Sequence, residues 1–149
     1  MVSELRETLY QLRAIVSEEE PLDAVAAGYV ERFVTRTGIP VSFTSNSNGK
    51  RLPLRVEQEL WRMLQEALTN VERHSQAHHA TVSWQIVGNR AELEIRDDGR
   101  GFKVHQVARE RFGLVGMGER ADGIGAHLTI DSEPGAGTRV LVEVEVPND

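Results

Sequence analysis

The stretch over residues 56–75 constrains the fold of this chain more than any other, because it carries two stripes at helical spacing. Apolar side chains recur every three or four residues, which is the spacing of one buried helix face. They are Val56, Leu60, Met63, Leu64, Ala67, Leu68 and Val71. The second stripe is polar and consists of Arg62, Glu66, Asn70 and then Arg73 or His74. The pattern predicts a long helix with one face in the core and a polar stripe beside it.

The position of Asn70 inside a helix calls for an explanation, because Asn is a mediocre helix former whose side chain competes for backbone hydrogen bonds. It lies deep in the predicted helix, one turn after Glu66. One interpretation is an ordinary solvated helix face. The other is a ligand site, in which the amide oxygen binds a hard cation, the carboxylate lies near a water molecule, and Arg and His lie near phosphate. The helix alone leaves both open.

Composition limits the classes of function that need to be considered. The 149 residues make one ordinary domain, 40% hydrophobic and 27% charged. The net charge of −6 argues against a general nucleic-acid binder, and the lack of cysteine excludes disulfides and thiolate chemistry. No apolar run approaches the roughly 18 residues of a membrane-spanning helix, and the charged N-terminus does not resemble a signal peptide. We expect a cytoplasmic domain, whether or not its parent protein is anchored in a membrane.

The rest of the chain reads as alternating helices and strands. We expect helices over residues 2–16, 22–37 and from 113 onward, and strands over 41–44, 80–87, 90–97, 126–130 and 140–146. The first of these helices has a one-sided apolar seam, which fits either an ordinary packed helix or the end of a longer helical bundle. Helices combined with antiparallel hairpins predict an α+β fold, a two-layer α/β sandwich with helices on one face of the sheet.

Asp97 is in phase with Leu93 and Ile95, so period two directs its carboxylate toward the buried side of the sheet. A buried carboxylate needs a hydrogen-bond donor. A ligand amino group would serve, unless the strand ends early and Asp97 only begins the turn. Gly99 and Gly101 follow, and glycine lets a backbone bend tightly and approach a ligand closely.

Gly116 and Gly118 lie in the first turns of the helix expected from residue 113. Each costs about 1 kcal/mol relative to Ala inside a helix. Their clustering predicts close approach of the backbone, either to a ligand or to the sheet. Because the free N–H groups of a helix N-terminus bind anions, phosphate is the ligand that this segment favours.

Four short motifs follow one another along the chain. They are EALTNVERH at 66–74, DDGRGF at 97–102, GLVGMGER at 113–120 and GAGT at 135–138. In this order they resemble the N box and the three glycine boxes of the ATP-binding catalytic domain of sensor histidine kinases, in the superfamily of gyrase, Hsp90 and MutL. The similarity is greatest to the nitrate-sensor and lipid-fluidity-sensor subgroup and covers residues 20–147. It implies the Bergerat ATP-binding fold, with a mixed, mostly antiparallel sheet.

The resemblance implies a role for each matching residue. Asn70 would coordinate the Mg²⁺ that bridges the ATP phosphates, and Glu66 would be the catalytic carboxylate that polarises the nucleophile. Arg73 would contact phosphate, His74 would contact the nucleotide near it, and Asp97 would accept a hydrogen bond from the adenine amino group. The other implied nucleotide-binding residues are Gly99, Gly101, Gly113, Leu114, Val115, Gly116 and Thr138. Residues 102–112 would form a short lid.

Two features depart from the family pattern. Gly118 stands where the subgroup has Arg or a similar long residue, and no histidine lies on the first expected helix. The resemblance therefore implies that the phosphoacceptor histidine lies on a separate dimerisation domain, with residues 1–17 the end of its last helix and linker and 18–149 the catalytic domain. Such a fragment would be monomeric, and its homodimeric parent would pass the phosphoryl group to a response regulator. Two alternatives remain, an anti-sigma-factor serine kinase of the same superfamily and a nucleotide-sensing module with no transfer activity.

Overall fold

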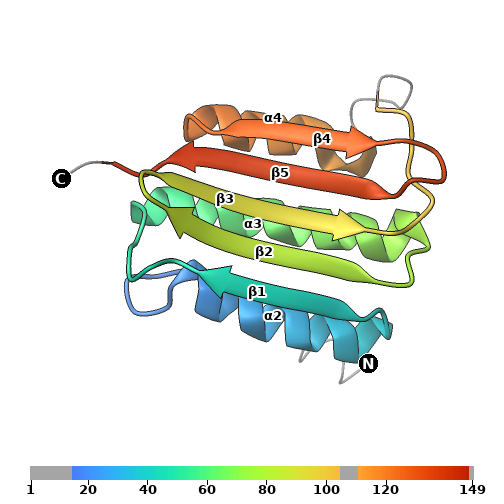
Figure 1. Ribbon diagram of the computed structural model, residues 1–149, viewed down its shortest axis with the longest axis horizontal. Coiled ribbons are helices and arrows are strands. Elements are labelled where there is room, and N and C mark those ends of the chain that lie inside the picture. The colour runs from blue at the N-terminus through green and yellow to red at the C-terminus, as the bar shows by residue number, and fades with distance from the viewer. Residues whose placement is uncertain (1–14, 105–110, 148–149) are drawn as a thin grey trace.

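The structure, a computed structural model, describes residues 15–104 and 111–147 (Figure 1). Nearly all of the helix expected over residues 2–16 lies outside these ranges, as do residues 105–110 of the expected lid. The helices are α2 (Leu22–Thr37), α3 (Leu54–Asn70) and α4 (Leu114–Gly123). The strands are β1 (Val41–Asn46), β2 (Ala80–Val87), β3 (Arg90–Asp97), β4 (His127–Ser132) and β5 (Thr138–Glu145).

The five strands form one sheet in the order β1-β2-β3-β5-β4. β1 runs parallel to β2, and the other three pairings are antiparallel. Figure 1 shows α2, α3 and α4 on the same side of this sheet. The expected two-layer α/β sandwich with a mixed, mostly antiparallel sheet is therefore confirmed.

The core lies between the helices and the sheet because each strand turns alternate residues toward the helices. In β2 and β3 the buried positions alternate with partly or fully exposed ones. The buried inward residues are Ala80, Val82, Trp84, Ile86, Ala91, Leu93, Ile95, Val140, Val142 and Val144. The helices contribute their apolar stripes, and the rings of Tyr29 on α2 and Trp61 on α3 meet edge to face, with 5.0 Å between their centroids.

The boundaries differ from expectation at a few element ends. α3 begins at Leu54, two residues before the predicted start, because Pro53 precedes it and proline is favourable there. The long helix expected to reach residue 75 changes at its end into a π-helical turn over Val71–Ser75. β1 continues through Asn46, two residues into the segment expected to be a turn, because its pairing with β2 extends to Gln85.

Glu57 is a buried charge that the sequence analysis did not single out. It is only 2% exposed, and one carboxylate oxygen accepts a hydrogen bond from the Leu22 N–H at 3.1 Å. The other oxygen accepts bonds from the Leu52 N–H at 2.9 Å and from Arg51 Nε at 2.8 Å. These partners satisfy a charge that would otherwise be costly to bury, and they join the N-termini of α2 and α3.

Residues close to Glu57 also hold in place the segment that precedes α2. Val16 is 0% exposed and belongs to the core. Gln58 Nε2 donates to the Val16 carbonyl at 3.1 Å, and the Arg51 guanidinium donates to the carbonyls of Ser17 and Glu18, both at 2.9 Å. The segment entering α2 is thus attached to the end of α3 that lies opposite Asn70.

Candidate functional site

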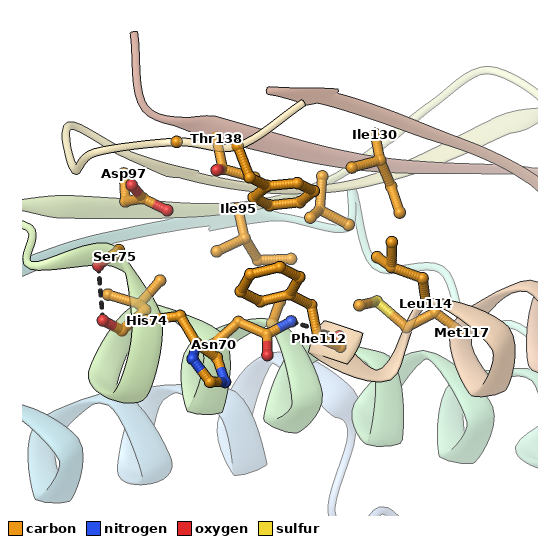
Figure 2. Close-up of a pocket in the computed structure, with 15 residues that line it drawn as sticks. Asn70, His74, Ser75, Ile95, Asp97, Phe112, Leu114, Met117, Ile130 and Thr138 are labelled. Atoms are coloured by element: carbon orange, nitrogen blue, oxygen red, sulfur yellow. Dashed lines mark hydrogen bonds between the residues drawn. The ribbon is translucent and has the colours of Figure 1, made fainter. Parts of the chain in front are cut away.

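A pocket lies between the C-terminal half of α3, the ends of β3 and β5, and the start of α4 (Figure 2). Six residues predicted from the sequence line it, namely Asn70, His74, Asp97, Gly101, Leu114 and Thr138. The other lining residues are Ala67, Val71, Ser75, Ile95, Phe102, Phe112, Met117, Ile130 and Val140. Residues from all four motifs therefore meet around one mostly apolar space with a few polar groups, which is the usual character of a small-molecule site.

Asp97 ends β3 on the inward side of the sheet, as the alternation predicted, and pairs with Thr138 on β5. One of its carboxylate oxygens accepts a hydrogen bond from the Gly99 N–H at 2.8 Å. Burial raises the pKa of the Asp97 carboxyl above its usual value. The neighbouring Asp98 charge adds to this rise, while the N–H groups of Gly99 and Thr138 oppose it. Asp97 is thus a partly desolvated acceptor in the wall of the pocket.

Asp98, the next residue, serves the fold rather than the pocket. Its carboxylate accepts hydrogen bonds from the backbone N–H groups of His78 at 2.8 Å and His79 at 3.0 Å. These two N–H groups hold the pKa of the Asp98 carboxyl below its usual value. Asp98 thereby fastens the loop between α3 and β2, and it offers a matched comparison for Asp97.

The π-helical turn Val71–Ser75 and the residue after it shape the helix side of the pocket. π-turns are rare and are frequent at functional sites. The turn ends at Gln76, whose φ of 53° reverses the chain. Arg100 secures this end, since its backbone N–H donates to the Ser75 carbonyl at 2.7 Å and its Nε donates to the His74 carbonyl at 2.6 Å. The helix end is thus fixed to the loop that follows Asp97.

Asn70 faces the pocket from the last turn of α3, and its Nδ2 donates to the Phe112 carbonyl at 2.6 Å. This bond uses the amide nitrogen, so it does not consume the amide oxygen that a hard cation would need. Glu66, one turn earlier, does not line the pocket. Its carboxylate instead packs against Gly113, where an added Cβ would lie 2.1 Å from Glu66 Oε1.

Two of the predicted glycines are explained by contacts within the protein. A Cβ on Gly99 would lie 2.3 Å from the Ser75 carbonyl oxygen, and a Cβ on Gly101 would lie 2.1 Å from the Glu133 carbonyl oxygen. Backbone of the chain itself, rather than a ligand, thus comes close at these positions. Gly99 accordingly does not line the pocket.

The two glycines in the first turns of α4, by contrast, have no described atom from other segments close to them. A Cβ on Gly116 or Gly118 would meet no described atom within 4 Å. Tight packing against the sheet, one of the two explanations left open by the sequence, is therefore excluded within the described residues. Gly116, Val115 and the exposed Arg73 also lie outside the lining of the pocket. Their proposed contacts with a nucleotide remain predictions.

Two aromatic rings in the pocket were not predicted as site residues. The rings of Phe102 and Phe112 are stacked, with 4.3 Å between centroids and 13° between planes, and the His74 ring meets Phe112 edge to face at 4.7 Å. Phe112 is 8% exposed and has a φ of 63°. No sequence pattern predicts that backbone angle, whereas the position of Phe102 at the end of the first glycine box is a signal from which its place in the pocket could be predicted.

Within residues 15–104 and 111–147, no helix is long and apolar enough to cross a membrane. The same ranges hold no cluster of three or more His, Cys, Asp or Glu side chains that could bind a metal ion.

Comparison with known proteins shows which family this chain belongs to. The model of the family described as histidine kinase-, DNA gyrase B-, and HSP90-like ATPases matches residues 55–148. The chain belongs to this ATPase family. The resemblance predicted from the four motifs is thereby confirmed, and this ATPase domain has the fold that the resemblance implied.

Curated relatives of this ATPase domain are sensor kinases. It is 32% identical over 148 residues to the signal transduction histidine-protein kinase/phosphatase DegS of Brevibacillus brevis. It is 35% identical over 144 residues to the sensor histidine kinase LiaS of Bacillus subtilis. These matches cover 99% and 97% of this chain but 38% and 39% of the relatives. The chain therefore spans about two fifths of their length.

A solved structure supports the fold of the ATPase domain. The blue-light activated histidine kinase of Erythrobacter litoralis EL346 superposes with a TM-score of 0.68 at 20% identity, over 85% of this chain and 42% of that one. At this identity the likeness bears on the fold alone.

Proposed function

We propose that this chain is the ATP-binding catalytic domain of a sensor histidine kinase. It would bind ATP in the pocket between α3 and the ends of β3 and β5, and it would transfer the γ-phosphate to a histidine on a separate dimerisation domain. The observation that carries the proposal is the half-buried Asp97 carboxylate, which lines the same pocket as Asn70 on the facing helix. The family match and the sensor kinase relatives support it.

Asp97 suits the recognition of adenine. Its carboxylate accepts a bond from the Gly99 N–H but has lone pairs left for a second donor. The exocyclic amino group of adenine is such a donor, whereas guanine carries an oxygen acceptor at the corresponding position. Thr138, paired with Asp97 across β3 and β5, lines the same end of the pocket. We therefore assign this end to the purine.

Asn70 suits the phosphate end. Mg²⁺ prefers oxygen ligands and commonly takes one or two from the protein, with the rest from substrate phosphates and water. The amide oxygen of Asn70, not used in its bond to Phe112, would supply a protein ligand. When bound, Mg²⁺ would neutralise charge on the phosphates during transfer. The exposed Arg73 and the N-terminus of α4 at Leu114–Gly116 would add positive charge there.

Glu66 is the proposed catalytic carboxylate. It lies on α3 one turn before Asn70, and Gly113 leaves room for its side chain at the start of α4. A carboxylate in this position would polarise the attacking imidazole, while positioning and electrostatic stabilisation would supply most of the rate. The acceptor would be the dimerisation domain of a homodimeric parent, and a response regulator would receive the phosphoryl group next.

The proposal is tested by trans-phosphorylation. The domain is mixed with a separately produced helical-hairpin dimerisation domain of the parent kinase and γ-labelled ATP with Mg²⁺, and acid-labile phosphate on histidine is measured. We expect labelling that requires both proteins and Mg²⁺. Replacing the acceptor histidine by Gln should abolish it. Labelling of serine on an added partner protein instead would favour the serine-kinase alternative.

A further inference from the structure

The side chain of Phe112 lies in the middle of the pocket that is proposed to bind ATP. Figure 2 shows this ring projecting from the turn just before α4 into the space between Asn70 and Ile95. The ring is stacked on Phe102 with 13° between their planes. The space that remains open in the pocket is about 30 Å³, which is enough for about two water molecules because one needs about 10–15 Å³ by the same measure. A purine ring system cannot enter the pocket while Phe112 occupies it.

Phe112 is held in this place by side-chain and backbone contacts against an unfavourable backbone conformation. A φ of 63° is rare for a bulky residue. The ring is retained by its stack with Phe102 and by the edge of the His74 ring, while Asn70 binds the Phe112 carbonyl. Because such strain persists only while surrounding contacts maintain it, the ring is in a position from which it can leave.

Phe102 is anchored in a different way, on the sheet side. Its backbone N–H donates to Ser132 Oγ at 2.8 Å, and this hydroxyl also contacts the Gly137 carbonyl at 3.1 Å and the Thr138 hydroxyl at 2.8 Å. The Gly101 backbone before it packs against the turn between β4 and β5. The loop after β3 that carries Phe102 is therefore anchored to the β4–β5 hairpin, which also supplies Thr138.

We propose that Phe112 occupies the place of the purine in the nucleotide-free domain, and that Phe102 stacks on the purine once Phe112 has left. The inference rests on the function proposed above and adds two residues to its site. A flat ring already stacks on Phe102 in this structure, and aromatic side chains stack on any base through its π-face. Phe112 thus competes with ATP for one aromatic partner, and its departure exposes that partner.

Because only domains whose pocket is open, with Phe112 outside it, can bind nucleotide, the apparent affinity is the intrinsic affinity multiplied by the fraction of open domains. Replacing Phe112 by Ala removes the competing ring but keeps the carbonyl that Asn70 contacts. We expect Mg-ATP to bind more tightly to the Phe112→Ala variant than to the original chain, by the reciprocal of the fraction of domains whose pocket is open. In the Phe112→Ala background, Phe102→Leu should then weaken Mg-ATP binding by about 5- to 150-fold, the range that corresponds to one lost base stack of about 1–3 kcal/mol.

The experiment is isothermal titration calorimetry with Mg-ATP and, as a probe without a base, inorganic tripolyphosphate with Mg²⁺. Phe102→Tyr keeps a stacking ring and should retain the affinity that Phe102→Leu loses. Tripolyphosphate affinity should differ little between Phe102→Leu and its parent variant. Val87→Ala serves as a control, because Val87 is 66% exposed at the far end of β2 and should leave both affinities unchanged. Circular dichroism verifies that each variant is folded.

Other results would overturn the roles proposed for Phe112 and Phe102, or the proposed function itself. If Phe112→Ala binds Mg-ATP more weakly than the original chain, Phe112 supports the nucleotide and the proposed competition is wrong. If Phe102→Leu leaves Mg-ATP affinity unchanged, or weakens tripolyphosphate equally, Phe102 does not stack on the base. If Mg-ATP binds and all variants match the control, this inference alone is overturned. If no folded variant binds Mg-ATP, the proposed function fails with it.

Discussion

Replacing Asp97 by Asn should change nucleotide selectivity because it replaces a charged hydrogen-bond acceptor with a neutral one. A hydrogen bond to a charged group contributes about 1.5–3 kcal/mol, against about 0.5–1.5 kcal/mol for a neutral one. The difference of about 1 kcal/mol corresponds to about a fivefold loss of Mg-ATP affinity. Mg-GTP, which presents an oxygen at the corresponding position, should lose nothing, so the ratio of the two affinities should fall.

The same substitution should stabilise the nucleotide-free domain. Burial raises the pKa of the Asp97 carboxyl in the folded state, so the ionised side chain costs stability above that folded pKa. The cost disappears as the pH falls below the pKa of the unfolded chain, where Asp97 is protonated in both states. Asp97→Asn should therefore raise the melting temperature at pH 7, and the gain should vanish toward pH 3.

Asp98→Asn is the matched control, because it makes the same chemical change one residue away. Two backbone N–H groups lower the pKa of Asp98, so its charge contributes stability at pH 7 that is lost as the pH falls through the folded pKa. Asp98→Asn should lower the melting temperature at pH 7 and leave the ATP to GTP ratio unchanged. Calorimetry and thermal melts measure both quantities. An equal loss of ATP and GTP affinity in Asp97→Asn would refute the assignment of Asp97 to adenine.

Three further substitutions test other parts of the molecule. Asn70→Ala should reduce Mg-ATP affinity to the value measured for ATP in EDTA while leaving the melting temperature nearly unchanged; normal Mg²⁺ dependence would contradict the metal assignment. Gly113→Ala places a Cβ against the Glu66 carboxylate and should lower trans-phosphorylation more than ATP affinity, as compared at saturating ATP. Glu57→Ala should cost about 3–5 kcal/mol in urea unfolding, because it leaves buried donors unpaired; a loss below about 1 kcal/mol would show that the Glu57 network is not needed.

Much of the fold could be predicted from periodicity, because each half-buried element repeats its burial at a fixed spacing. The alternation of Val82, Trp84 and Ile86 specified which face of β2 meets the helices, and the spacing of apolar residues specified the buried face of α3. The same reasoning predicted that Asp97 points inward. It could not predict the π-helical turn at 71–75, because a change of hydrogen-bond register leaves residue spacing almost unchanged.

The residues of the candidate site could be predicted where a polar side chain stands at a position that normally disfavours it. Asn70 in a helix and Asp97 on a buried face are anomalies that a ligand would explain, and both line the pocket. Phe102 and Phe112 are not anomalous in sequence, since apolar rings are expected in any core. Their role depends on a backbone angle at Phe112 and on packing between segments distant in the chain. Glu57 was missed for a similar reason, because its partners Leu22 and Arg51 come from other segments.

The central claim is that one pocket receives the two ends of a single adenine nucleotide. It is tested most directly by titrating the folded, unmodified chain with Mg-ATP and Mg-GTP in a calorimeter. We predict saturable binding of one Mg-ATP per chain, weaker when Mg²⁺ is removed, and much weaker binding of Mg-GTP. A well-folded sample that shows no saturable heat with Mg-ATP, or that binds both nucleotides equally well, would contradict the account.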